Sequence, residues 1–166
     1  ANWRGKQWDC ENFLLLAKAL TAKDGILPDA RIAVIAAAQE RSQVEALFHA
    51  FSKERIIDLV GQADLTGIIA CLKRCHFFVG NDSGLTHMAA AVGLPTLSLF
   101  GPSHPELYAP WGEHTGWVKT PETYEELVGA SDYDHRKTGS LMGSLSVDIV
   151  ETAARSLWCR TKMVPL

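Results

Sequence analysis

Short apolar runs alternate along the chain with longer stretches in which apolar residues recur every three to four positions. The first pattern predicts buried strands and the second predicts amphipathic helices. The expected strands span residues 31–38, 56–60, 76–80, 96–100 and 116–120. The expected helices span residues 10–22, 41–52, 65–74, 84–92 and 146–158, and the polar stretch 129–143 is expected to be a loop.

Local signals support several of these boundaries. Asp9 and Asp64 precede two of the helices, where a short acidic side chain can cap the first turn. Gly93 follows the helix 84–92, at the position where glycine commonly ends a helix. Strands that alternate with helices favour a parallel sheet covered on both faces, which predicts an α/β, three-layer Rossmann-like fold. Such folds bind ligands at the carboxyl ends of their strands.

Composition narrows the class of protein. The chain has 166 residues, 47% hydrophobic and 21% charged, which is ordinary for a globular protein and predicts one domain over residues 1–166. Its net charge of −3 argues against a nucleic-acid partner. No apolar run approaches the length of a membrane span, and the first residues do not resemble a signal peptide. The four cysteines lack metal-ligand spacing, so we expect free thiols in a reducing cytosol.

The most informative short stretch is Asn81-Asp82-Ser83-Gly84, between an expected strand and an expected helix. One interpretation is structural, with Asp82 or Ser83 capping the helix. The other is an anion site, because the first amides of a helix lack intrahelical partners and carry partial positive charge. In that case the amides of residues 83–86 would face the anion, Ser83 or Thr86 would add a hydroxyl, and Gly84 would permit close approach.

Neighbouring residues fit either interpretation. His87 lies one turn into the same helix and is either a structural histidine or a donor that faces the ligand. Gly101-Pro102-Ser103 ends the next strand and is either a tight turn or the opposite lip of the same cleft. Neither common glycine-rich phosphate fingerprint, G-x-G-x-x-G or G-x-x-x-x-G-K-[ST], occurs in the sequence.

The ordered stretch 79–112, VGNDSGLTHMAAAVGLPTLSLFGPSHPELYAPWG, resembles the carboxyl-terminal half of the family 9 glycosyltransferases, which include the ADP-heptose:lipopolysaccharide heptosyltransferases. Two further stretches are similar to the same family: GKQWDCENF at 5–13 and MGSLSVDIVETA at 142–153. The resemblance implies the half of a GT-B fold that holds a nucleotide-sugar donor such as ADP-heptose, with no bound cofactor and no metal.

Carried over position by position, the resemblance implies a set of donor contacts. Lys6 would approach the phosphates and stabilise the leaving diphosphate, and Glu40 would meet the ribose hydroxyls. Asp82 would face the sugar hydroxyls or cap the helix, because its charge would repel a phosphate. The full set of expected contacts is Lys6, Glu40, Asp82, Ser83, Gly84, Leu85, Thr86 and His87.

The family's acceptor site and general base lie in an amino-terminal half that has no counterpart in this sequence. We therefore expect a part of an inverting glycosyltransferase of lipopolysaccharide or related glycan synthesis, inactive alone, with the lipid-linked or glycan acceptor bound by that other half. The alternatives are a stand-alone nucleotide-binding or regulatory module and, third, a nucleotide-sugar epimerase relative. The expected location is the cytoplasm, at the inner face of the inner membrane. Self-association is expected through an exposed apolar face, for which Trp3, Trp8, Trp111 and Trp158 are the candidates, although each could equally be an ordinary core residue.

Overall fold

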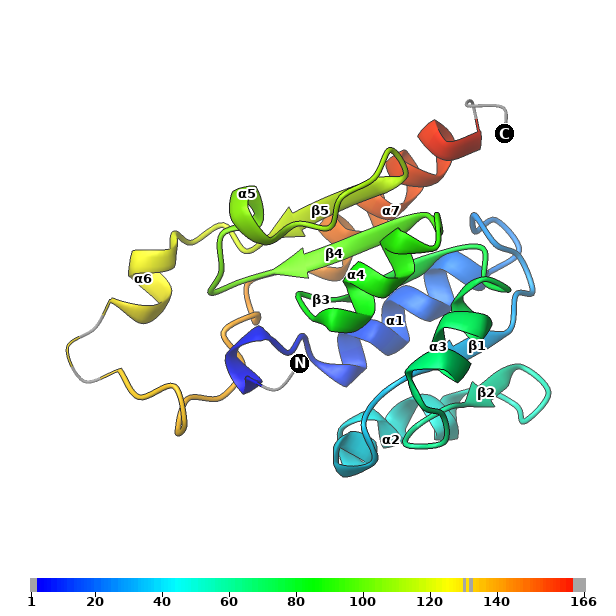
Figure 1. The fold of residues 1–166 in the computed structure, drawn as a ribbon, viewed down its shortest axis with the longest axis horizontal. Coiled ribbons are helices and arrows are strands. Elements are labelled where there is room, and N and C mark those ends of the chain that lie inside the picture. Colours follow the sequence, from blue (N-terminus) through cyan, green and yellow to red (C-terminus); the bar gives the residue numbers. More distant parts are fainter. Residues whose placement is uncertain (1–2, 130, 132, 163–166) are drawn as a thin grey trace.

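The protein has an α/β fold in which short parallel strands are flanked by helices (Figure 1). The computed structural model describes residues 3–129, 131 and 133–162. One sheet pairs β1 (Ile32–Val34) with β2 (Ile56–Asp58). The other has the order β3 (Phe78–Asn81), β4 (Thr96–Phe100) and β5 (Thr115–Lys119), all parallel. The expected fold class is confirmed, although the strands form two sheets within the described residues and not one.

Helices and single turns connect these strands. The helices are α1 (Cys10–Thr21), α2 (Arg41–Ala50), α3 (Leu65–Leu72), α4 (Gly84–Ala91), α5 (Pro105–Tyr108), α6 (Tyr124–Val128) and α7 (Val147–Lys162). The turns of 3-10 helix are η1 (Arg4–Lys6) and η2 (Ala38–Glu40). The five helices expected from the sequence are present, whereas α5, α6 and both 3-10 turns were not predicted because they are shorter than a periodic pattern can show. The expected loop 129–143 has no helix or strand at its described residues, and its positions 130 and 132 lie outside them.

Two of the predicted helix boundaries are confirmed in atomic detail. The amide of Gly67 donates to Asp64 Oδ1 over 2.8 Å, so Asp64 caps α3. Gly93 has a φ of 78°, the left-handed conformation that favours glycine after a helix. The expected cap at α1 is wrong: Asp9 occupies the N-cap position, but its side chain accepts no hydrogen bond from the first turn.

The first strand is much shorter than its apolar run. The sequence predicts a strand over 31–38, but β1 ends at Val34. The chain turns soon after it because Glu40 Oε2 accepts a hydrogen bond from the amide of Ala37 over 2.9 Å, which closes the turn η2. Alanines at 36–38 do not oppose this turn, since alanine has little preference for strands.

The main core lies between the β3-β4-β5 sheet and the helices α1 and α7. Every residue of β4 is buried. Leu97 and Leu99 of β4 pack in one cluster with leucines of α1 and with Val150 and Leu157 of α7. Fully burying a side chain of this size stabilises the fold by about 1.5–3 kcal/mol. This packing fixes the carboxyl ends of β3 and β4, where the predicted site lies.

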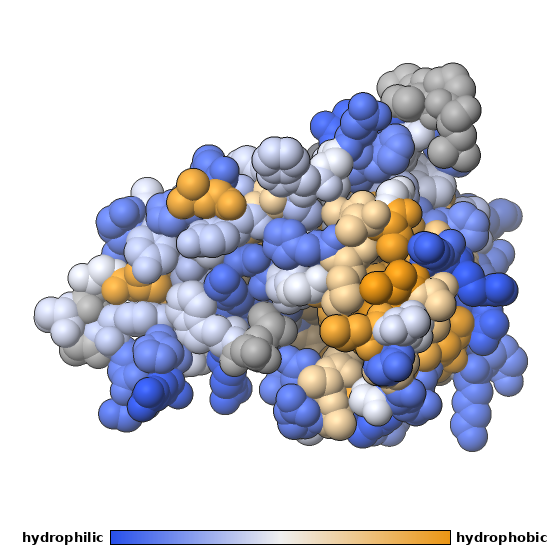
Figure 2. Space-filling view, in the orientation of Figure 1, coloured by the Kyte–Doolittle hydropathy of each residue, from blue (hydrophilic) through white to orange (hydrophobic). Residues whose placement is uncertain are grey.

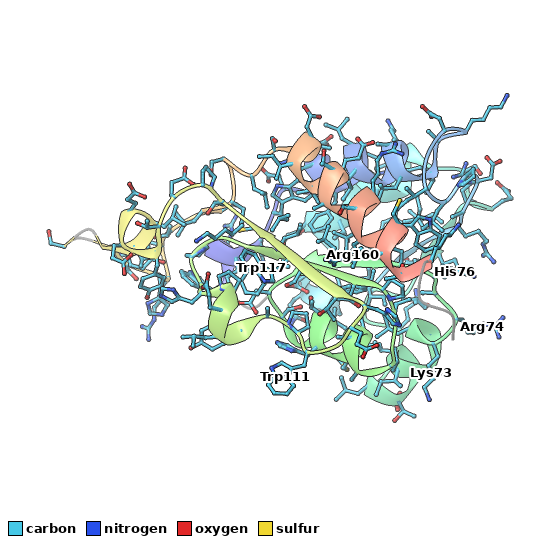
Figure 3. All side chains as sticks on the ribbon, turned by 90° about the horizontal axis from the view of Figure 1, so that it is seen from above. Lys73, Arg74, His76, Trp111, Trp117 and Arg160 are labelled. Carbon is cyan, nitrogen blue, oxygen red and sulfur yellow. The ribbon has the colours of Figure 1, made fainter. Side chains whose placement is uncertain are left out.

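The surface differs from the tryptophan-rich face that we expected. Trp8 is only 3% exposed and belongs to the core, so for this residue the core alternative is correct. Trp158 is half-buried against Phe77. Trp111 is 94% exposed and projects away from the ribbon (Figure 3). In the view of Figure 2, hydrophobic residues gather over α3 and α4. Among the described residues, no helix has both the length and the hydropathy that crossing a bilayer requires.

Candidate functional site

Lys6 is held in place by the segment that precedes α7. The amide of Leu141 donates to the carbonyl oxygen of Gly5 over 3.1 Å. Two residues after Lys6, the buried indole of Trp8 donates from Nε1 to the carbonyl oxygen of Leu145 over 2.8 Å. The turn η1 is thus fixed on both sides of Lys6, so this lysine is less free than an ordinary surface lysine.

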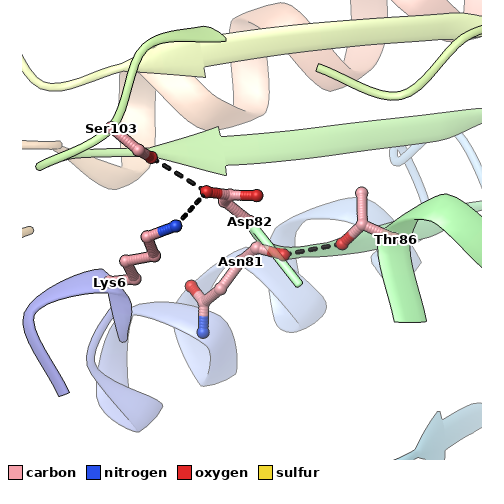
Figure 4. A network of polar contacts seen from close by, with 5 residues as sticks. All are labelled: Lys6, Asn81, Asp82, Thr86 and Ser103. Carbon is pink, nitrogen blue, oxygen red and sulfur yellow. Dashed lines mark hydrogen bonds and ion pairs between the residues drawn. The ribbon is translucent and has the colours of Figure 1, made fainter. Parts of the chain in front are cut away.

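The ammonium group of Lys6 meets the carboxylate of Asp82 at the carboxyl end of β3. Lys6 Nζ lies 2.5 Å from Asp82 Oδ2, and Ser103 Oγ donates to the same oxygen over 2.9 Å (Figure 4). Asp82 and Ser103 are 9% and 8% exposed. The interpretation of Gly101-Pro102-Ser103 as the opposite lip of the site is therefore supported, because its serine contacts Asp82 directly.

A close approach of two segments puts Ser103 in position. A Cβ atom at Gly101 would lie 2.4 Å from Met142 Sδ, so glycine at this position lets the strand exit pass the Met142 side chain as it is placed. The amide of Ser103 donates to the carbonyl oxygen of Gly101 over 2.8 Å, which turns the chain back toward Asp82.

The structure does not support the capping interpretation of this stretch. Ser83 occupies the N-cap of α4, but its side chain makes no capping hydrogen bond, and Asp82 directs Oδ2 to Lys6 and Ser103. Among the described residues, none accepts a hydrogen bond from the amides of Ser83, Gly84 or Leu85. Gly84 is exposed, and a Cβ atom built on it would meet no atom within 4 Å. The helix therefore begins with amide donors that an approaching anion can reach.

The hydrogen-bond donors of Thr86 are used inside the turn. It is 1% exposed, its Oγ1 donates to the carbonyl oxygen of Asn81 over 2.6 Å, and its amide donates to Ser83 O over 3.1 Å. Both donors are used within the turn, so this geometry favours Thr86 as a residue that shapes the site and not as a ligand contact.

Asn81 belongs to the candidate site, although it was not among the expected contacts. Its Oδ1 accepts a hydrogen bond from the amide of Trp8 over 3.1 Å, which joins β3 to the segment that follows Lys6. An asparagine at the end of a strand next to Asp82 was visible in the sequence, but its partner is 73 positions away and no local pattern indicates it.

Tyr108 was also missed. Its ring centroid lies 5.8 Å from Lys6 Nζ, and the ring of Trp3 lies 5.9 Å from the same atom. Tyr108 is 53% exposed on the short helix α5. Aromatic faces at this distance attract an ammonium group, so they help to hold Lys6 in this position.

The remaining predicted contacts are placed less tightly. Leu85 is half-buried and His87 is exposed, both in the first turn of α4. Glu40 is the last residue of η2, which follows β1. Strand β1 belongs to the sheet that does not contain β3. The carboxylate of Glu40 accepts a hydrogen bond from the amide of Ala37. The structure therefore brings together Lys6, Asp82 and the start of α4, and it leaves the ribose role of Glu40 a prediction.

The described residues also include free cysteines and two grooves elsewhere. Cys10, Cys71 and Cys75 are half-buried free thiols, and burial raises the pKa of Cys75 above its ordinary value. Within the described residues, no group of three or more metal-ligating side chains is placed to hold an ion. Two shallow grooves of about 440 and 530 Å³ run along β5 and α7, and the first is lined in part by Trp117 and Arg160 (Figure 3). Neither groove includes Lys6 or Asp82.

Known proteins share this fold and parts of this sequence. Lipooligosaccharide heptosyltransferase 2 of Haemophilus influenzae is 30% identical over 120 residues, which are 70% of this chain and 33% of that protein. Lipopolysaccharide heptosyltransferase 2 of Escherichia coli is 29% identical over 125 residues, or 74% of this chain and 34% of that protein. The chain thus spans about a third of the length of these relatives.

Solved structures agree at the level of the fold. The ADP-heptose lipopolysaccharide heptosyltransferase II of E. coli superimposes with a TM-score of 0.76 at 20% identity, over 97% of this chain and 44% of that one. A family 9 glycosyltransferase from Veillonella parvula gives 0.77 at 22% identity, over 96% and 44%. An E. coli heptosyltransferase solved with ADP gives 0.73 at 20% identity, over 95% and 42%.

The family itself is identified by a sequence model. The model for glycosyltransferase family 9 (heptosyltransferase) matches residues 1–134, which include Lys6, Asp82 and all of α4. The match thus covers the residues that form the candidate site as well as most of the fold. The chain belongs to glycosyltransferase family 9.

Proposed function

We propose that this chain binds the nucleotide-sugar donor of an inverting, heptosyltransferase-like enzyme of lipopolysaccharide synthesis. The observation that carries the proposal is the contact of the Lys6 ammonium with Asp82, two residues before α4, together with the amides of Ser83, Gly84 and Leu85, which have no acceptor among the described residues. A diphosphate is the part of such a donor that fits one ammonium group and a helix N-terminus.

The same groups can assist the chemistry. When the glycosidic bond breaks, negative charge builds up on the leaving diphosphate. The ammonium of Lys6 and the first amides of α4 are already oriented before the reaction, so they can stabilise this charge without reorganisation. Gly84 keeps the approach to these amides open, since it carries no side chain.

Asp82 has a separate task in this proposal. Its Oδ2 accepts hydrogen bonds from Lys6 and Ser103, so the carboxylate orients the ammonium group. A buried carboxylate next to a diphosphate is repulsive unless it is compensated, and Lys6 supplies the compensation. The second carboxylate oxygen is then suited to accept a hydrogen bond from a sugar hydroxyl. We assign Asp82 to sugar recognition and Lys6 to the phosphates.

The rest of the reaction is assigned to the portion of the relatives that this chain does not match. We expect that portion to bind the lipid-linked or glycan acceptor and to supply the general base, at the cytoplasmic face of the membrane. The 166-residue chain then binds donor without transferring sugar. Adenine is the proposed base, because a structural neighbour was solved with ADP.

Titration calorimetry with ADP tests the proposal. We expect saturable binding with a Kd below about 1 mM. Lys6→Met should weaken binding by about tenfold or more, because a charge-assisted contact to phosphate is lost. Lys18→Met is the matched control, since Lys18 is exposed on α1 away from the site. Absence of saturable heat, or equal affinities in both variants, would contradict donor binding at this place.

A further inference from the structure

The outer edge of strand β5 is open. In the described part of the chain, β5 is the last strand of its sheet and pairs with β4 alone. The amide of Thr96 in β4 donates to the carbonyl oxygen of His114, so the ladder to β4 uses the even-numbered residues of β5. The amides of Thr115, Trp117 and Lys119 therefore point away from β4, and none of the described residues accepts a hydrogen bond from them.

The two shallow grooves follow this edge, and α7 forms one wall of both. The groove of about 440 Å³ passes Thr115 and Arg160, and the groove of about 530 Å³ passes Val118 and Asp148. The two grooves share Ala153 at the middle of α7. Arg160 Nη2 also donates to the carbonyl oxygen of Thr115 over 3.3 Å. Helix α7 thus runs antiparallel to β5, and its exposed side continues the open edge.

This edge carries apolar side chains and little that prevents pairing. Trp117, at the middle of β5, is 43% exposed, and Ile149 of α7, in the second groove, is 48% exposed. Proteins commonly keep an edge strand from pairing with proline or with charged side chains. Strand β5 contains no proline, and its one charged residue, Lys119, stands at its end. Figure 3 shows Trp117 and Arg160 on this side of the molecule.

We propose that this edge joins two copies of the chain in a symmetric dimer, in which the two β5 strands pair antiparallel about a two-fold axis at Trp117. In this register the outward amide and carbonyl of Thr115 meet those of Lys119 in the second copy, and the two Trp117 residues exchange hydrogen bonds. It is the register that pairs all three outward residues. The two tryptophans also lie directly opposite each other, which adds a favourable aromatic contact.

The charges on α7 indicate that the occupant is a second copy. Asp148 lies in the first turn of α7 and Arg160 in the last, and both are exposed beside the grooves. Because α7 packs on the sheet next to β5, the two-fold axis brings the two α7 helices side by side and antiparallel. Asp148 of each copy then faces Arg160 of the other. Ala153 lies between these charges, and its small side chain permits a short distance between the helices.

Sedimentation equilibrium with two charge variants tests the dimer. The unchanged chain should form a reversible dimer as its concentration rises. Asp148→Lys and Arg160→Glu each make both contacts between the α7 helices repulsive, so each variant alone should dimerise at least about tenfold more weakly. Both side chains are exposed, so neither substitution should unfold the chain. Lys18→Glu, an equal change of charge on α1, is the matched control and should dimerise normally.

An equimolar mixture of the two variants is the sharpest arm of this test. In a mixed pair the introduced lysine faces the introduced glutamate, and the native Arg160 faces the native Asp148, so dimerisation should recover. ADP affinity should be the same in every chain, because neither groove includes Lys6 or Asp82. The dimer and the proposed donor site can therefore fail separately.

Amide hydrogen exchange measured by NMR locates the contact. Exchange of the Trp117 amide should slow by about tenfold or more as the chain passes from monomer to dimer. Exchange of the Val118 amide, which faces β4, should change less. A chain that is still monomeric at about 1 mM would overturn the inference. Equal dimerisation of the charge variants and the unchanged chain, or no recovery in the mixture, would also overturn it. Protection of Trp117 that does not depend on concentration would mean that the same chain covers the edge, which excludes the dimer.

Discussion

Lys6 and Asp82 are 76 positions apart in the sequence, yet Lys6 Nζ lies 2.5 Å from Asp82 Oδ2 at the carboxyl end of β3. The side chain of Asp82 is 8% exposed and that of Lys6 is 25% exposed. The contact therefore joins the start of the described chain to the centre of the fold. It also decides how much of the Lys6 charge is available to an anion.

Breaking this pair from the lysine side should destabilise the protein. Lys6→Met leaves the carboxylate of Asp82 buried, with the uncharged Ser103 as its remaining donor among the described residues, so we expect a loss of about 1–3 kcal/mol in the free energy of unfolding. The double variant Lys6→Met/Asp82→Asn should recover part of this loss, because no uncompensated charge remains. Urea unfolding of the two single variants and the double variant measures the coupling, and strict additivity would contradict it.

Removing the charge of Asp82 should separate recognition of phosphate from recognition of sugar. Asp82→Asn keeps an acceptor for Lys6 but removes a negative charge beside the anion site. We therefore expect ADP to bind about threefold to tenfold more tightly. An ADP-sugar should gain less or lose affinity, because its hydroxyl contact is weakened. Calorimetry with both ligands checks this, and parallel changes for the two would refute the assignment of Asp82 to the sugar.

A substitution at Gly84 should change ligand affinity without lowering the stability of the fold. A Cβ atom at this position meets no protein atom within 4 Å, so Gly84→Ala should leave the melting temperature unchanged or raise it. The same methyl group would stand over the first amides of α4 and should weaken ADP binding by at least about fivefold. Gly139→Ala is the control, because its Cβ would also meet no atom. Unchanged ADP affinity in Gly84→Ala would place the phosphates elsewhere.

Asn81 should act on the ligand only through Lys6. Asn81→Ala removes the acceptor of the Trp8 amide, so we expect a loss of about 1 kcal/mol in stability. We also expect weaker ADP binding, because the segment that carries Lys6 is held less firmly. In the background of Lys6→Met, the same substitution should leave ADP affinity unchanged. A further loss there would mean that Asn81 contacts the ligand itself.

Stability should depend on pH through an ion pair outside the site. Arg41 donates to Asp58 at the end of β2, and this hydrogen bond lowers the pKa of Asp58 below its ordinary value of 3.8. Because the pKa of Asp58 is lower in the folded protein than in the unfolded chain, the ion pair stabilises the fold at pH values above the unfolded-state pKa. This stabilisation is lost as the pH falls through the folded-state pKa. The difference in melting temperature between the protein and Asp58→Asn should therefore be constant from pH 5 to 7 and shrink below about pH 3.8. A difference that grows on acidification would contradict the sign.

The sequence predicts the order of the main elements well, because each has a period or a run long enough to recognise. Strand β4 and helix α3 follow directly from such patterns, and Asp64 marks the start of α3 as expected. The apolar run 31–38 misleads, since alanines continue the hydrophobic pattern through residues that turn. No local pattern could have shown that β1 and β3 lie in separate sheets, because pairing is set by contacts between distant segments.

The candidate site was only partly predictable for a related reason. The amides at the start of α4 follow from a helix boundary, which the sequence indicates clearly. The orientation of Lys6 depends on Leu141 and Trp8, and the burial of the Thr86 hydroxyl depends on its bond to Asn81. These are tertiary hydrogen bonds, so a pattern of residue types cannot distinguish a donor that faces a ligand from one that is used inside the turn.

The central claim is that the diphosphate of a nucleotide meets the start of α4 beside Lys6. Titrating the ¹⁵N-labelled chain with ADP and following its amide resonances tests this most directly. The account predicts that the largest saturable shifts occur at Ser83, Gly84 and Leu85. Shifts confined to the groove along β5 and α7, or no saturable shift at the start of α4, would contradict it.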